Sequence, residues 1–209
     1  MSRVMLIFAT ALLALLSGAL FYAARIPVTA QQATPPTANA EPAATGEPSA
    51  RAVVTYPEFT LPDVTGEPRS FSEWQGKNRL INFWATWCAP CRREIPLLKA
   101  FQDEQSGNGF EVIGIAVDFP EAVAEYAESA QFNYPVLVGE QDAMAVAESS
   151  GIDFIGMPFT MFVAADGEYL SAYIGELHQE HLDAVVDVMT RLERAEIDKQ
   201  AARAELDAL

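Results

Sequence analysis

Two cysteines, Cys88 and Cys91, lie three positions apart at the junction of two unlike stretches of the chain. The apolar run Leu80–Trp84 before them has the length and composition of a buried strand, and the stretch from Arg92 onward has helical spacing. A Cys-x-x-Cys pair in this position is the sequence form of a dithiol/disulfide redox site. The first sulfur would lie at the helix N-terminus, where unpaired N–H groups and the helix dipole favour a thiolate. We therefore expect Cys88 to be the nucleophile and Cys91, deeper on the same helical face, to be the resolving thiol.

A zinc site and a purely structural disulfide are the alternatives for this pair. Zinc needs two more ligands, and the only histidines, His178 and His181, lie far along the chain. Together with Glu176 and Glu180 they form at most a weak metal pattern, so we expect neither a metal nor a cofactor. A disulfide across so short a loop would constrain little of the unfolded chain, which makes stability a poor reason for it.

The N-terminal part of the chain predicts export. Val4–Ala24 is a run of 21 residues without a charge. As a helix it would be roughly 31 Å long, which is enough to cross a hydrocarbon core of about 30 Å. We expect residues 1–25 to be a single-pass anchor in the inner (cytoplasmic) membrane. A cleaved signal peptide is the alternative, since Val28–Ala30 is a small-residue cleavage pattern. Either would place the rest of the chain in the periplasm or another extracytoplasmic space, where disulfide chemistry is common.

The remainder divides into a tether, a folded domain and a tail. Residues 26–55 are rich in Pro, Ala and Thr and predict an extended linker. Residues 56–192 alternate strand and helix patterns, which predicts an α/β fold with a mixed sheet and helices on both faces. Residues 193–209 are charged and predict a solvated helical tail, or else a partner-binding or dimerising helix.

Within the domain, turn and cap residues delimit the elements. The turn residues of Asp63–Pro68 predict a short hairpin, and Asp118–Glu121 resembles a capping box for a helix that ends near Ala130. The predicted strands are Leu80–Trp84, Phe110–Val117, Val136–Val138, Phe159–Val163 and Tyr169–Ile174. The predicted helices are a short one over Ser70–Gln75, one from the cysteines to Gly107 with Pro96 inside it, one before Ala130, one over Asp142–Ser150 and one carrying the apolar stripe Leu182–Leu192.

The charge of the chain is strongly negative and unevenly distributed. The net charge is -16, and between Phe101 and Thr190 there is no Lys or Arg against seventeen Asp or Glu. Nucleic acid and anionic lipid surfaces should be repelled, so we expect no nucleic-acid partner. The acidic surface could favour basic substrates, or it could serve only solubility or adaptation to a salty medium.

Three segments resemble a known family. Asn82–Pro96 resembles the active-site segment of thioredoxin-like proteins, most closely the membrane-anchored TlpA/ResA branch of extracytoplasmic thiol:disulfide reductases, which includes the thioredoxins of cytochrome c maturation. Gly156–Thr160 is similar to the cis-proline segment of that family, and Val117–Val138 resembles the strand-helix insert of this branch. The resemblance spans Tyr56–Leu192 and implies a thioredoxin-like fold.

The resemblance also implies roles for individual residues. It implies a cis peptide at Met157–Pro158, with Met157 offering its backbone to an extended substrate. Glu94 would help remove the proton of Cys91, since the aspartate used by cytoplasmic thioredoxins is replaced here by Asn82.

Spacing and position support some of these roles. Glu94 lies one helical turn after Cys91, within reach for direct or water-mediated transfer, although it could equally be a solvated first-turn acid. We expect the substrate to contact Trp87 and Pro90, which adjoin the cysteines.

These residues predict a reductase cycle. Cys88 would attack a partner disulfide, and Cys91 would resolve the mixed disulfide. The resemblance implies protein substrates such as apocytochrome c and a membrane thiol relay of the CcdA/DsbD type as electron donor. A disulfide oxidase of the same fold is the main alternative, because direction depends on redox potential. A copper-handling thioredoxin-fold module is a weaker one, since those modules typically use a Cys-x-x-x-Cys spacing.

Overall fold

The computed structural model describes residues 55–149 and 156–209. The predicted anchor, the cleavage pattern and nearly all of the predicted linker lie outside these residues, as do Gly151 and its neighbours. In the described part of the chain, no helix combines the length and the apolar character needed to cross a membrane.

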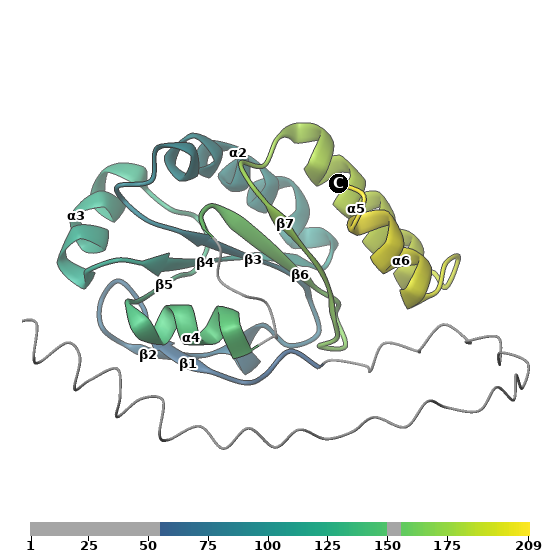
Figure 1. Ribbon diagram of the computed structural model, residues 1–209, viewed down its shortest axis with the longest axis horizontal. Helices are drawn as coiled ribbons and strands as arrows, with labels where there is room; N and C mark the ends of the chain where they lie inside the picture. The colour runs from purple at the N-terminus through teal and green to yellow at the C-terminus, as the bar shows by residue number, and fades with distance from the viewer. Residues whose placement is uncertain (1–54, 150–155) are drawn as a thin grey trace, which may run out of the picture. The chain divides into compact units, whose positions relative to one another are not determined.

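A five-stranded mixed sheet with β3 (Asn78–Trp84) at its centre forms the middle of the domain (Figure 1). The strand order is β5-β4-β3-β6-β7, where β3, β4 and β5 are parallel and β6 and β7 are antiparallel. Every residue of β3 is buried, because layers cover both faces of the sheet. The predicted strands are therefore confirmed, with bounds β4 Phe110–Val117, β5 Val136–Gly139, β6 Phe159–Val163 and β7 Tyr169–Ile174.

Two apolar layers lie on opposite faces of this sheet. One packs under the helices α2, α3 and α5, and the other packs under α4 and a short hairpin (Figure 1). Side chains alternate along β3, so Leu80 and Trp84 enter the first layer while Ile81 and Phe83 enter the second. The bounds are α2 Ala89–Gln105, α3 Pro120–Ala130, α4 Gln141–Ser149, α5 Gln179–Glu193, β1 Thr60–Pro62, β2 Pro68–Ser70 and the 3-10 turns η1 Phe71–Trp74 and η2 Ser106–Asn108.

The predicted capping box at Asp118 is wrong. α3 begins at Pro120 as expected, but its N-cap is Phe119, and no side chain caps the helix. The Asp118 carboxylate is turned toward the loop before Cys88, where it binds Thr86. The sequence pattern therefore predicted α3 correctly, but Asp118 binds Thr86 and does not cap this helix.

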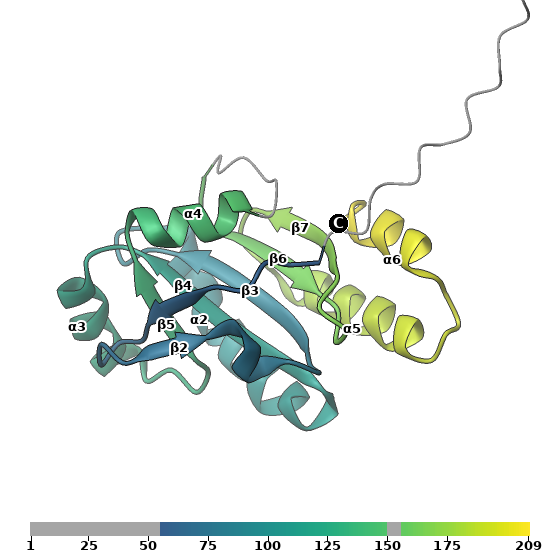
Figure 2. The same cartoon turned by 90° about the horizontal axis from the view of Figure 1, so that it is seen from below.

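The C-terminal tail is not a solvated helix. α6 (Lys199–Leu206) lies alongside α5 (Figure 2) and also packs against β7. It buries Ala202 and Leu206. These two residues are four apart, so they form one apolar stripe on an otherwise charged helix. Charged side chains of α6 also bind the rest of the domain, since Lys199 and Arg203 both form ion pairs with the carboxylate of Glu168.

Candidate active site

The two cysteines form a disulfide at the N-terminus of α2, directly after the central strand. Cys88 is the N-cap residue of α2, and its Sγ accepts a hydrogen bond from the Cys91 N–H at 3.3 Å. Pro90 lies in the first turn and is half-buried. Cys88 is 5% exposed, whereas Cys91 is completely buried. An incoming thiol can therefore approach only the Cys88 sulfur, and the Cys91 N–H is placed to stabilise a thiolate there.

Glu94 lies one turn further along α2, three residues after Cys91. It is 1% exposed, so it is not a solvated first-turn acid. Burial raises the pKa of its carboxyl from 4.5 to about 7, while hydrogen bonds from the Leu177 N–H at 2.7 Å and the Asn82 Nδ2 at 2.8 Å hold that pKa lower than burial alone would. A carboxyl that titrates near neutral pH is suited to exchange a proton with a neighbouring thiol.

Asn82 connects this acid to the rest of the sheet. Its amide nitrogen donates both to Glu94 and to the Thr160 hydroxyl on β6, at 2.9 Å. The backbone N–H of Leu177, in the loop after β7, also donates a hydrogen bond to the Glu94 carboxylate. The sequence interpretation missed Thr160 and Leu177, although Thr160 belongs to the segment that resembles the family's cis-proline region.

The Met157–Pro158 peptide is cis, as the family resemblance implied. Pro158 is buried, and its carbonyl oxygen accepts a hydrogen bond from the Gly175 N–H at 2.9 Å. Met157 is half-buried and packs against the apolar layer that contains both cysteines. The segment predicted to bind substrate therefore shares one cluster with the disulfide.

Three exposed apolar side chains follow or end β3, β4 and β7 at the edge of the sheet that carries the disulfide, and we call them the apolar rim: Trp87, Phe119 and Ile174, which are 68%, 62% and 51% exposed. They are the large apolar side chains that stand exposed among residues 55–149 and 156–209. Trp87 precedes Cys88, and Ile174 precedes the glycine that bonds to Pro158. The sequence predicted Trp87 as a contact residue but missed Phe119 and Ile174, because exposure depends on the fold.

Asp118 fixes the loop that carries Trp87. One carboxylate oxygen accepts the Thr86 N–H at 2.9 Å and the Thr86 hydroxyl at 2.6 Å, and the other accepts the Phe119 N–H at 2.8 Å. Asp118 is almost fully buried. It therefore holds two members of the apolar rim in place from the end of β4.

Asp118→Ala is expected to destabilise the fold by about 1–3 kcal/mol, because two backbone N–H groups and a hydroxyl lose their acceptor. It should also slow thiol exchange at Cys88, since the loop before that residue is released. Chemical unfolding and a disulfide reduction assay measure the two effects. Asp63→Ala is the matched control: its carboxylate binds Thr65 and Glu67 in the β1–β2 turn in the same manner, so it should lose stability but keep exchange activity.

His178 and His181 lie at the start of α5, directly after Leu177. His181 accepts a hydrogen bond from the His178 backbone through Nδ1, and no three metal-binding side chains cluster in the described part of the chain.

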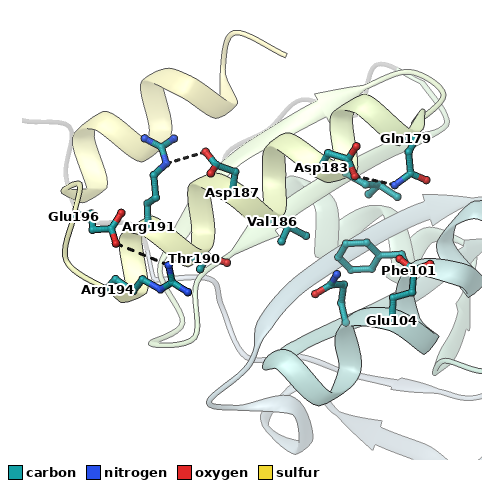
Figure 3. A pocket seen from close by; sticks show the side chains of 12 residues that line it. Phe101, Glu104, Gln179, Asp183, Val186, Asp187, Thr190, Arg191, Arg194 and Glu196 are labelled. Carbon is teal, nitrogen blue, oxygen red and sulfur yellow. Dashed lines mark hydrogen bonds and ion pairs between the residues drawn. The ribbon is translucent and has the colours of Figure 1, made fainter.

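A groove of about 460 Å³ runs between α5 and the C-terminal end of α2 (Figure 3). It is lined by Phe101 and Val186 and by acids including Asp183, and it begins roughly 20 Å along α2 from Cys88.

Comparison with known proteins agrees with this geometry. The ResA thiol-disulfide oxidoreductase of Geobacillus kaustophilus (strain HTA426) is 29% identical over 130 residues, which are 62% of this chain and 72% of that protein. The thioredoxin-like protein YneN of Bacillus subtilis (strain 168) is 27% identical over 138 residues, 63% of this chain and 76% of YneN. The crystal structure of a thiol:disulfide interchange protein of the thioredoxin family from Chlorobium tepidum TLS is 28% identical with a TM-score of 0.61, covering 68% of this chain and 99% of that one.

These similarities confirm the thioredoxin-like fold and the ResA-like resemblance predicted from the sequence. Residues 54–171 match the model of the AhpC/TSA family. The matched range is more than half of the chain and includes Cys88, Cys91, Glu94 and Pro158. The chain therefore belongs to the AhpC/TSA family of thioredoxin-like proteins.

Proposed function

We propose that this thiol-disulfide oxidoreductase reduces disulfide bonds in partner proteins outside the cytoplasm. The apolar rim carries this proposal. Only the Cys88 edge of the disulfide is accessible, and Trp87, Phe119 and Ile174 expose apolar surface at the same edge of the sheet. Exposed apolar surface that is rimmed by polar residues marks sites where proteins bind. A small thiol would need no such surface, whereas an extended polypeptide with a disulfide would cover it.

The geometry supports a two-step exchange. The Cys88 thiolate attacks one sulfur of the partner disulfide, which expels the other sulfur as a thiolate and leaves a mixed disulfide. Cys91 then loses its proton to Glu94, and its thiolate attacks the Cys88 sulfur. The mixed disulfide breaks, the second partner sulfur leaves as a thiolate that takes up a proton, and the Cys88–Cys91 disulfide forms. Two electrons pass from this protein to its partner.

The cellular setting forms part of the proposal. Val4–Ala24 would anchor the chain in the cytoplasmic membrane, and the following linker would hold the domain in the periplasm or an equivalent space. The ResA-like resemblance supports apocytochrome c as one substrate, and the acidic surface would favour basic segments of it. A membrane thiol relay of the CcdA/DsbD type would return the protein to its dithiol form.

The reduction potential of the Cys88/Cys91 couple tests the direction of transfer. Full-length protein is equilibrated with dithiothreitol or glutathione at neutral pH, and the dithiol fraction is counted by alkylation and mass spectrometry. A potential at or below about -250 mV is expected of a reductase. A value near about -120 mV would overturn the proposal and indicate the oxidase alternative.

Trp87→Ala and Phe119→Ala are expected to reduce kcat/KM for a protein disulfide by about tenfold each, because truncating an aromatic contact residue commonly has an effect of this size. The rate with a small aromatic disulfide should change little, since that reagent needs only the Cys88 sulfur. Parallel assays with insulin and with the small disulfide measure both rates. Equal losses with the two substrates would show that the rim shapes the thiol itself and does not bind the partner.

A further inference from the structure

Four buried side-chain nitrogen or oxygen atoms of the described residues have no hydrogen-bond partner. Three of them are Asn82 Oδ1, Trp84 Nε1 and the Tyr134 hydroxyl. The fourth, Arg79 Nε, belongs to the opposite face of β3, because side chains alternate along a strand. Buried polar atoms in folded proteins almost always pair with protein atoms or with an ordered water. Three such atoms on one face of the sheet therefore call for an explanation.

The strand register brings the three atoms together. Asn82 and Trp84 are two residues apart on β3, so both side chains point toward the face covered by α2. Gly114 lies opposite Asn82 on β4. A Cβ at Gly114 would lie 3.2 Å from both Trp84 Nε1 and the Cε2 atom of Tyr134. The missing side chain thus lets the indole N–H and the tyrosine ring converge over one point of β4.

Glu94 borders the same point. Its carboxylate accepts the Asn82 amide, and burial together with this nearby carboxylate raises the pKa of the Tyr134 hydroxyl. The other charged group that acts on Glu94 is Glu176 in the loop after β7, which is paired with Arg93. Cys91 on α2 is held in the disulfide and does not titrate, and Tyr126 on α3 acts on Tyr134. Tyr134, two residues before β5, is therefore close enough to Glu94 for their electrostatic interaction to matter.

We propose that one buried water molecule is held between Glu94 and these three side chains, and that Tyr134 positions Glu94 through it. Such a water would accept two hydrogen bonds and donate two, which uses its full capacity. The water would accept from the Trp84 indole N–H and from the Tyr134 O–H, and would donate to Asn82 Oδ1 and to the Glu94 carboxylate. The bond to the carboxylate stabilises its charged form. Tyr134 is thus a positioning residue, and the inference rests on the role of Glu94 in the proposed cycle.

The test is a direct titration of Glu94 in the oxidised full-length protein in detergent micelles. The carboxyl carbon is followed by ¹³C NMR and assigned with Glu94→Gln. Tyr134→Phe should raise the Glu94 midpoint by about half to one pH unit, because the water loses one of the donors that hold it. Tyr126→Phe is the matched control. Its ring also contacts Trp84, at 5.5 Å between centroids, and it should leave the midpoint unchanged.

A high-resolution crystal structure of the oxidised protein provides the second measurement. A water within about 3.2 Å of both the Tyr134 hydroxyl and a Glu94 oxygen is expected. Equal Glu94 midpoints in Tyr134→Phe and the unmodified protein, or a dry site in the crystal, would overturn the inference. Neither readout depends on turnover, so a failure of the reductase proposal in the redox titration would be distinguishable from a failure here.

Discussion

Cys91→Ser is expected to stop the catalytic cycle at the mixed disulfide. Cys88 keeps its place at the α2 N-terminus and its exposed edge, so it should still attack a partner. No second thiol remains to release that partner, and turnover should fall by at least about 10³-fold, as when other catalytic nucleophiles are removed. Stopped reactions separated on non-reducing gels should show a covalent adduct with the substrate protein.

Cys88→Ser is the control for this experiment. It should be equally inactive and should form no adduct, because Cys91 is completely buried. An adduct with Cys88→Ser in place of Cys91→Ser would reverse the roles assigned to the two cysteines. The trapped adduct also offers a route to the natural partner, since the covalent bond survives purification.

Glu94→Gln is expected to slow resolution of the mixed disulfide by about 10²- to 10⁴-fold, the usual contribution of a general base. In the unmodified protein the resolving rate should rise with pH through about 7, because only the ionised carboxylate can accept the Cys91 proton. In Glu94→Gln the resolving rate should not show this rise through about pH 7. Rapid-mixing kinetics between pH 5.5 and 9 measure it, with Glu104→Gln as control, since Glu104 is an exposed acid on the same helix. If the resolving rate of Glu94→Gln rises through about pH 7 as in the unmodified protein, Glu94 is not the base that accepts the Cys91 proton.

The same carboxyl makes stability depend on pH. Its folded-state pKa, about 7, lies above the ordinary value of 4.5, so folding favours the protonated form. The stability that this group contributes is complete below about pH 4.5 and is lost as pH rises through about 7, by up to about 3 kcal/mol. Glu94→Gln stays neutral. Its stability relative to the unmodified protein should therefore be more favourable at pH 8 than at pH 5 in urea unfolding experiments.

Local patterns predicted most of the secondary structure of the described domain. Apolar runs such as Phe110–Val117 are buried on both faces of the sheet, and such strands need no partner to be recognised. The cysteine spacing likewise placed the disulfide at the start of α2. Patterns were less informative where a side chain had a choice of partners. Asp118 had the spacing of a helix cap, yet its carboxylate binds Thr86, which lies far from it in the sequence.

The charged tail shows the same limit. A helix with only two well-spaced apolar residues, Ala202 and Leu206, resembles a solvated one, and whether it packs depends on a surface that other elements build. Here α5 and β7 supply that surface.

The sequence by itself determined the dithiol chemistry, the α/β class and, through the family resemblance, the cis-proline segment. These follow from residues that are close together in the chain or carry their chemistry in their identity. Only the tertiary structure decided that Glu94 is buried with a pKa near neutral pH, and that Trp87, Phe119 and Ile174 are exposed at one edge of the sheet. Burial and the convergence of distant strands create those properties, and neither exists until the chain folds.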